Sequence, residues 1–204
     1  MPVEPATPPA GRAPRADARR NRDRVLEVAA EVVSEQGAQA SLRDIARRAD
    51  VGLGTLYRHF PTRDALLEAL LRRRFELLAE RAEELAAAVA PDRALGDWLR
   101  EFTRGAGAYQ GLSAALLATL QDPESPLHAS CLTMRQACGR LLVAAQRDGL
   151  IRPDVDAVDL FALANGLAWI ADQAPSLAER SDRLFGLVLD GLAPRGGGTG
   201  PAAG

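Results

Sequence analysis

The chain has 204 residues, 47% of them hydrophobic and 25% charged, and a formal net charge of -2. This length provides enough core for one large or two small stable domains. The longest strongly apolar stretch without charge, residues 160–171, is shorter than the ~20 residues of a membrane-spanning helix, so we expect no membrane segment. Helical periodicity without β-branched alternation predicts an all-α fold of about nine helices.

The charges are unevenly distributed along the chain. All 25 basic residues are arginines, and lysine is absent. Residues 12–63 contain 11 arginines and seven acidic residues, a net charge of +4, whereas residues 65–204 contain 14 arginines and 18 acidic residues. A basic pole on an acidic body suits an anionic partner at one end of the molecule.

The two cysteines, Cys131 and Cys138, lie in one predicted helix. Seven residues of helix separate them by about 10 Å, which is too far for a disulfide. Free thiols and the lack of a signal-peptide pattern predict a reducing, cytoplasmic location. His128 and Cys131 could share a helix face, but they lack further ligands nearby, so we expect no metal site and no cofactor. No adjacent group would lower a thiol pKa, which disfavours a redox sensor.

The ends of the chain differ in composition from its middle. Residues 1–18 are rich in Pro and Ala and residues 193–204 in Gly, and neither shows periodicity, so both are expected to be disordered. Between them we expect one domain over residues 19–64 and a second over residues 65–192. The first begins with a helix over residues 19–36, which Gly37 ends, followed by a short helix that Ser41 and Asp44 cap.

The next segment has the composition of a DNA-binding helix. Residues 50–52 form a turn, a third helix covers residues 53–60, and Pro61 ends it. Two short helices joined by a glycine-containing turn, behind a longer helix, predict a helix-turn-helix whose second helix enters the major groove. Gly54 would allow the backbone to approach DNA closely, and Gly52 would adopt the non-helical geometry between the two helices.

The face of this helix opposite Leu56 and Phe60 carries groups that bind phosphates or base edges. These are Thr55, Arg58 and His59, with Tyr57 at the flank. Each residue also has a structural alternative: Leu53 joins the core, Tyr57 packs half-buried, His59 interacts favourably with the helix dipole, and Arg58 is solvated. The six arginines between residues 12 and 24 form either a solvated tail or an arm in the minor groove.

The stretch "SLRDIARRADVGLGTLYRHFPTRDALLEAL" closely resembles the DNA-binding segment of TetR-type transcriptional regulators, and the match extends over residues 19–71. Gly52 departs from the commoner serine, which removes a possible phosphate-binding hydroxyl. Leu53 occupies a position that is often polar, so its base contact would be apolar, for example to a thymine methyl. By position, the resemblance implies DNA contacts from Arg43, Leu53, Gly54, Thr55, Tyr57, His59 and Arg63.

The remainder of the chain is predicted to be helical. A fourth helix runs from Thr62 to about Ala88, and further helices are expected near residues 92–107, 111–120, 124–149, 156–173 and 176–192. In TetR-type proteins this portion binds a small ligand and forms the homodimer, so the resemblance implies both. The candidate residues for lining a ligand pocket are large apolar side chains and isolated polar ones: Trp98, Phe102, Tyr109, Leu112, Leu116, His128, Met134, Asn165 and Trp169. The alternative is that these residues simply belong to the core.

The last two predicted helices favour a dimer independently of the resemblance. Residues 160–171 are apolar on nearly all sides, and a helix of this kind must be covered on several faces. Pairing with the same helices of a second chain would cover them in a four-helix bundle, whereas the alternative is a core within one chain. The candidate interface residues are Leu160, Leu163, Leu167, Leu177, Leu184, Phe185, Val188 and Leu192.

These features predict a homodimeric TetR-type repressor that binds a pseudo-palindromic DNA operator and is released by a small hydrophobic effector. A two-fold dimer requires half-sites that are one helical turn, or a multiple of it, apart. The alternatives are an activator, a regulator that responds to a partner protein, and an architectural DNA-binding protein without a ligand. An enzyme is not expected, because the sequence shows no phosphate loop, nucleophile elbow, metal-ligand spacing or isolated carboxylate pair.

Overall fold

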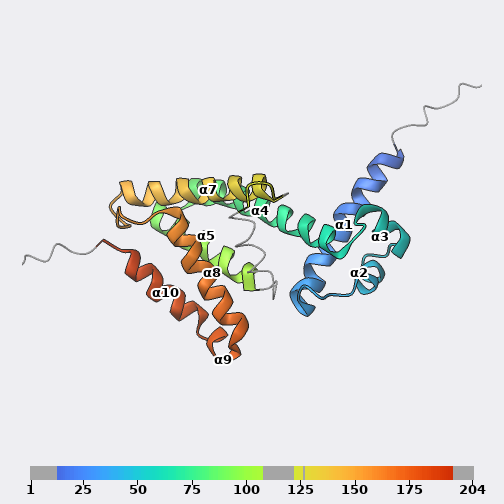
Figure 1. The fold of residues 1–204 in the computed structure, drawn as a ribbon. Coiled ribbons are helices and arrows are strands. Elements are labelled where there is room, and N and C mark those ends of the chain that lie inside the picture. Colours follow the sequence, from blue (N-terminus) through green and yellow to red (C-terminus); the bar gives the residue numbers. More distant parts are fainter. Residues whose placement is uncertain (1–12, 108–121, 126, 195–204) are drawn as a thin grey trace, which may run out of the picture. The chain divides into compact units, whose positions relative to one another are not determined.

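The computed structural model describes residues 13–107, 122–125 and 127–194. Within these residues every regular element is a helix and no strand occurs, which confirms the all-α prediction. The helices are α1 (Ala13–Gln36), α2 (Leu42–Arg48), α3 (Leu53–His59), α4 (Arg63–Ala88), α5 (Pro91–Gly107), α7 (His128–Arg147), α8 (Ala157–Gln173), α9 (Pro175–Ala178) and α10 (Ser181–Leu192) (Figure 1). The helix expected near residues 111–120 lies outside the described residues.

Three helix boundaries differ from the sequence-based expectation. Helix α1 begins at Ala13 rather than near residue 19, so residues 13–18 are helical instead of lacking regular structure. The helix expected from residue 124 begins at His128, because the side chains of Asp122 and Ser125 accept hydrogen bonds from the backbone two residues ahead and hold a turn there. The segment expected as one helix over residues 176–192 forms α9 and α10, separated where Arg180 N–H bonds to the Leu177 carbonyl in a four-residue turn.

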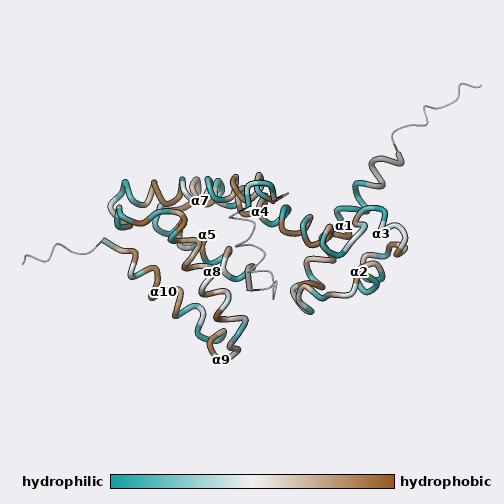
Figure 2. Tube along the Cα trace, in the orientation of Figure 1, coloured by the Kyte–Doolittle hydropathy of each residue, from teal (hydrophilic) through white to brown (hydrophobic). Residues whose placement is uncertain are grey.

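The chain divides into two compact units, residues 1–70 and residues 71–204, and α4 contributes to both. In the first unit, α1, α2 and α3 pack on one another around a small core. Its buried side chains include Val25, Val32, Ile45, Leu56 and Phe60. Figure 2 shows apolar and polar residues interspersed along α1 and α4, the pattern of helices that bury one face and expose the other.

The second unit is organised around α5, which packs against α7 and α8. The rings of Trp98, Phe102 and Phe161 form one cluster, with centroids 5.3 to 6.0 Å apart. Trp98 is fully buried, and its indole N–H donates a 2.7 Å hydrogen bond to the Leu78 carbonyl on α4. This bond satisfies the only polar group that the indole buries. No helix in the described part of the chain is long and apolar enough to cross a membrane.

Candidate nucleic-acid interface

Helix α2 is short, and its ends are fixed by local hydrogen bonds. Ser41 is the N-cap, with an extended backbone and a side-chain oxygen that accepts from Asp44 N–H at 3.4 Å, as the sequence predicts. Ile45 and Ala46 are buried against the other helices of the unit. With one side buried and both ends held, the outer side of α2 presents Arg43 in an exposed position.

The turn from α2 to α3 sets the direction of the second helix. Asp50 has φ 55°, in the left-handed region, and Val51 N–H bonds back to the Ala46 carbonyl at 3.0 Å. Gly52 then takes the N-cap position of α3 with an extended backbone. Leu56 and Phe60 are buried and hold α3 to the core of the unit. The structure therefore has the predicted helix-turn-helix.

The opposite side of α3 is open. A β-carbon added at Gly54 would meet no other part of the described chain within 4 Å, and Gly54 does not have a positive φ. Packing within the protein therefore does not require a glycine at this position. Tyr57 is 45% exposed, which leaves its ring available rather than packed into the core.

Other candidates on α3 have contacts within the protein. The Thr55 hydroxyl accepts a 2.8 Å hydrogen bond from the Arg58 guanidinium, so these two side chains form one polar group on the surface. His59 is half-buried beside the Phe60 ring, at a centroid distance of 6.3 Å. Leu53 is also half-buried, an exposure that fits either of its two predicted roles.

Arg63 is the first residue of α4, and a side chain from the distant α1–α2 turn holds it. Its Nη1 donates to Oε1 of Gln39 at 2.7 Å. Its Nε is buried without a hydrogen-bond partner among the described residues. Sequence reasoning did not find Gln39, because the two residues are 24 positions apart and no periodicity links them.

The acidic side chain nearest to Arg43 in the sequence is neutralised locally. Asp44 pairs with Arg47 and with Arg48, and Arg48 also reaches Glu35 of α1 at 2.8 Å. The hydrogen bond from Arg47 is the largest of the influences that lower the pKa of Asp44. The carboxylate is therefore charged and paired at neutral pH, and it opposes the approach of DNA less than a free carboxylate would.

One arginine of the predicted amino-terminal arm has a contact inside the unit. The Arg22 guanidinium lies over the Phe60 ring, 5.5 Å from its centroid. This cation–π contact covers the carboxyl end of α3 from α1. Arg22 thus belongs to the folded unit rather than to a solvated tail.

The predicted pocket residues occupy different environments in the second unit. Trp98, Phe102 and Met134 are buried in the core, and His128 is half-buried. Asn165 is 4% exposed; its Nδ2 donates to the Phe161 carbonyl at 2.8 Å, and its Oδ1 has no partner among the described residues. Trp169 is 55% exposed, so within one chain it lies on the surface and not in an interior pocket. Tyr109, Leu112 and Leu116 lie outside the described residues.

The predicted dimer residues also divide by burial. Leu160, Phe185 and Leu192 are buried by the chain itself, so they support the α8–α10 surface rather than form its outer face. Leu163 is 42% exposed, and the rest are half-buried: Leu167, Leu177, Leu184 and Val188. Val158 and Leu187, which the sequence analysis did not single out, are both more exposed than Leu163.

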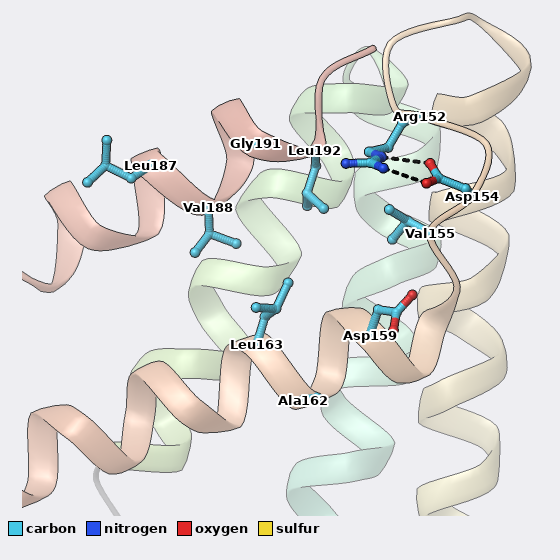
Figure 3. Close-up of a pocket in the computed structure, with 10 residues that line it drawn as sticks. All are labelled: Arg152, Asp154, Val155, Asp159, Ala162, Leu163, Leu187, Val188, Gly191 and Leu192. Carbon is cyan, nitrogen blue, oxygen red and sulfur yellow. Dashed lines mark hydrogen bonds and ion pairs between the residues drawn. The ribbon is translucent and has the colours of Figure 1, made fainter. Parts of the chain in front are cut away.

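A groove of about 530 Å³ runs between α8 and α10. Figure 3 shows Leu163 on α8 facing Val188 and Leu192 on α10 across this space. The pair of Arg152 and Asp154 lies at one end, and Arg152 N–H bonds to the Leu192 carbonyl at 2.9 Å, which ties the α7–α8 loop to the end of α10. The groove is thus apolar in its middle and charged at one end.

Comparison with known proteins identifies the family. Residues 25–70 match the model of bacterial regulatory proteins of the tetR family, and residues 90–194 match the C-terminal domain of SbtR-like transcriptional regulators. The chain belongs to the TetR family of transcriptional regulators. As in other TetR-family regulators, its helix-turn-helix is a DNA-binding element.

Individual relatives cover most of this TetR-family chain. It is similar to the TetR regulator SCO0520 from Streptomyces coelicolor, with 40% identity, 86% of this chain and 99% of that chain covered, and a TM-score of 0.69. A TetR regulatory protein from Mycobacterium vanbaalenii is 37% identical, with 88% and 99% covered and a TM-score of 0.64. The curated repressor KstR2 from Rhodococcus jostii is 26% identical over 84% of this chain and 91% of its own length.

Proposed function

We propose that this regulator is a homodimeric, cytoplasmic repressor that binds a pseudo-palindromic operator and is released by a small hydrophobic effector. The main support for this proposal comes from the outer face of α3. It combines an exposed tyrosine with a glycine that the protein's own packing does not require. Such a surface leaves room for another molecule to approach the backbone closely.

The proposed DNA contacts are those that the resemblance to TetR-type regulators implies by position, and the exposure of Gly54, Tyr57 and Arg43 supports them. Leu53, Gly54, Thr55, Tyr57 and His59 of α3 enter the major groove, where the first turn of a recognition helix reaches base edges. Two arginines flank α3 in the sequence and bind phosphates: Arg43, which is exposed on α2, and Arg63 at the start of α4. Phosphate contacts fix the register of the helix, and the α3 side chains provide the sequence preference.

The dimer is assigned to the outer faces of α8 and α10. Val158, Leu163 and Trp169 of α8 and Leu187 of α10 are each more than 40% exposed. Leu163 and Leu187 both line the groove between these neighbouring helices, and exposed apolar patches mark protein contact sites. A two-fold axis through the patch would cover it with the same residues of a second copy, in a four-helix arrangement.

The effector is assigned to the interior of the second unit, near α5, α7 and α8. Its support is Asn165, whose Oδ1 is buried without a hydrogen-bond partner among the described residues, one helical turn from the aromatic ring of Phe161. A buried acceptor without a partner is energetically costly, and a ligand hydrogen-bond donor would satisfy it. An effector that binds one body conformation better than another shifts the protein away from the DNA-binding state by that difference in affinity.

The DNA-binding part of the proposal is tested by selecting duplexes from a random-sequence pool with the purified protein. We expect an inverted repeat whose half-site centres are about 10 base pairs, or a multiple of this, apart. Inserting about five base pairs between the half-sites should abolish tight binding, because it rotates one half-site to the opposite side of the duplex. Equal binding to all duplexes would refute a sequence-specific regulator and favour an architectural protein.

A further inference from the structure

Arg63 lies where a cation is electrostatically unfavourable. It is the first residue of the 26-residue helix α4, and a helix amino terminus carries a partial positive charge. Thr62 caps this end in the usual way, since its side-chain oxygen accepts from Ala65 N–H at 3.0 Å. The cap satisfies a backbone donor but does not neutralise the charge of the Arg63 guanidinium. An anion bound by the guanidinium would offset this unfavourable interaction.

The polar partner of Arg63 is a neutral side chain rather than a carboxylate. Among the described residues its guanidinium donates a hydrogen bond to Gln39 alone, at 2.7 Å. By contrast, Arg47 and Arg48 of the same unit pair with carboxylates. The bond to Gln39 therefore fixes the direction of the Arg63 guanidinium without neutralising its charge.

The backbone around Gln39 is held firmly enough to serve as a support. Gly37 has φ 73° and its N–H bonds to the Val33 carbonyl at the end of α1, at 2.8 Å. Ala40 N–H bonds to the Gly37 carbonyl at 3.0 Å, which closes a turn around Gln39. Ser41 follows immediately as the cap of α2. The support is therefore tied to both α1 and α2.

The chemistry of the two side chains fixes which atoms remain for a ligand. A guanidinium has donors only, so the amide oxygen of Gln39 must face it, and the amide NH₂ points elsewhere. Gln39 is exposed, so this NH₂ is accessible, and three N–H bonds of the two terminal guanidinium nitrogens are not used for Gln39, whereas Nε–H is buried. Both groups offer donors to one acceptor-rich anion.

We propose that Gln39 is a positioning residue for DNA binding: it holds the Arg63 guanidinium against a DNA phosphate and donates to the same phosphate through its amide. This inference rests on the proposed function, in which Arg63 contacts DNA. Phosphate oxygens accept several hydrogen bonds at once, and a preorganised charged donor loses less freedom on binding. The loop between α1 and α2 thus takes part in operator binding together with α3.

The test compares four variants on one duplex, the inverted repeat that the full-length protein selects from a random-sequence pool. The variants are Gln39→Ala, Arg63→Ala, the double variant, and Gln36→Ala as the control. Gln36 is also an exposed glutamine of this unit, but it donates to Asp44 instead of Arg63. The dissociation constant is measured by electrophoretic mobility shift over a range of salt concentrations.

Arg63→Ala should lower affinity and reduce the slope of log K against log salt by about one per recognition helix. Gln39→Ala should weaken binding by roughly two- to tenfold and lower the slope in the same direction, because an arginine that is not held spends less time on the phosphate. The double variant should bind more tightly than the product of the two single losses predicts, because part of the loss in Gln39→Ala passes through Arg63. Gln36→Ala should match the unmodified protein in affinity and slope.

The outcomes separate this inference from the proposed function. If the losses of Gln39→Ala and Arg63→Ala multiply in the double variant, or if Gln39→Ala behaves like Gln36→Ala, Gln39 does not act through Arg63 and the inference is overturned. If Arg63→Ala itself binds normally, the assigned phosphate contact fails as well. A purely structural effect of Gln39→Ala would lower the thermal unfolding midpoint and leave the salt slope unchanged, which also overturns the inference.

Discussion

Replacing Gly54 by alanine should stabilise the protein while weakening its binding to DNA. The added methyl group meets no other part of the described chain within 4 Å, and Gly54 does not have a positive φ, so the free protein accommodates it without strain. Gly54 is the second residue of α3, where alanine is a better helix former than glycine. Glycine at this position therefore makes the folded protein less stable than alanine would, and no packing contact requires it.

The two effects have different magnitudes. Glycine in a helix costs about 0.5 to 1 kcal/mol relative to alanine, and the lower value applies in the first turn. A gain of about 0.5 kcal/mol in a unit of this size corresponds to a rise of about 2 to 4 °C in its thermal unfolding midpoint. At the DNA surface, the same methyl group would overpack a close contact at a cost of about 1 to 3 kcal/mol, or roughly five- to 150-fold in affinity.

Calorimetry of the free protein and mobility-shift titration with the selected duplex measure the two effects separately. The matched control is Gly139→Ala in the middle of α7, where an added β-carbon also meets no neighbour within 4 Å among the described residues. It should stabilise the second unit and leave DNA binding unchanged. Normal DNA affinity in Gly54→Ala, together with a raised midpoint, would show that α3 does not approach DNA through Gly54.

Three further predictions address the rest of the molecule. Tyr57→Ala and Arg43→Ala should each weaken operator binding about tenfold or more without changing the sedimentation of the oligomer; normal binding by both would remove the site assignment. Leu163→Glu should raise the dimer dissociation constant by about 30-fold or more, because a two-fold interface buries the new group twice, at about 1 to 3 kcal/mol each for an unpaired neutral polar group and more for a charged one. Val143→Glu, at an equally exposed apolar position on α7, should leave the dimer intact, and equal effects of the two variants would argue against the α8–α10 interface. Burial raises the pKa of Cys138 to about 12, above its unfolded value near 9. Its thiol should therefore resist alkylation at pH 8 until the protein unfolds, and rapid alkylation of the native protein would contradict this burial. Its contribution to the stability of the fold should decline as the pH rises from 9 to 12, because the unfolded state loses the thiol proton first.

Local signals in the sequence were sufficient to predict the helix-turn-helix. The cap at Ser41, the turn at Gly52 and the stop at Pro61 act within a few residues, so α2 begins directly after its predicted cap and α3 lies within one residue of its expected limits. The burial of Leu56 and Phe60 follows from helical spacing in the same way. Local hydrogen bonds also explain the boundaries that were missed, since the turn at Asp122 and Ser125 depends on side-chain orientation and not on periodicity.

Contacts between distant segments could not be predicted in this way. The bond between Gln39 and Arg63 depends on how the α1–α2 turn meets the start of α4. Periodicity also did not show which side of the apolar helix α8 its own chain would cover. Packing on α5 and α7 buries Leu160 and leaves Leu163 exposed, although both are leucines of one apolar stretch. Which side of α8 stays exposed is therefore decided by the packing of its neighbouring helices.

The contrast between the two tryptophans provides built-in optical reporters. Trp98 is shielded from solvent and hydrogen-bonded to a backbone carbonyl, whereas Trp169 is largely accessible on α8, and the chain has only these two. Emission from Trp98 should be blue-shifted and should change only when the second unit unfolds. Acrylamide should quench Trp169 preferentially in the separated chain, and loss of that quenching with rising protein concentration would follow self-association without any attached dye.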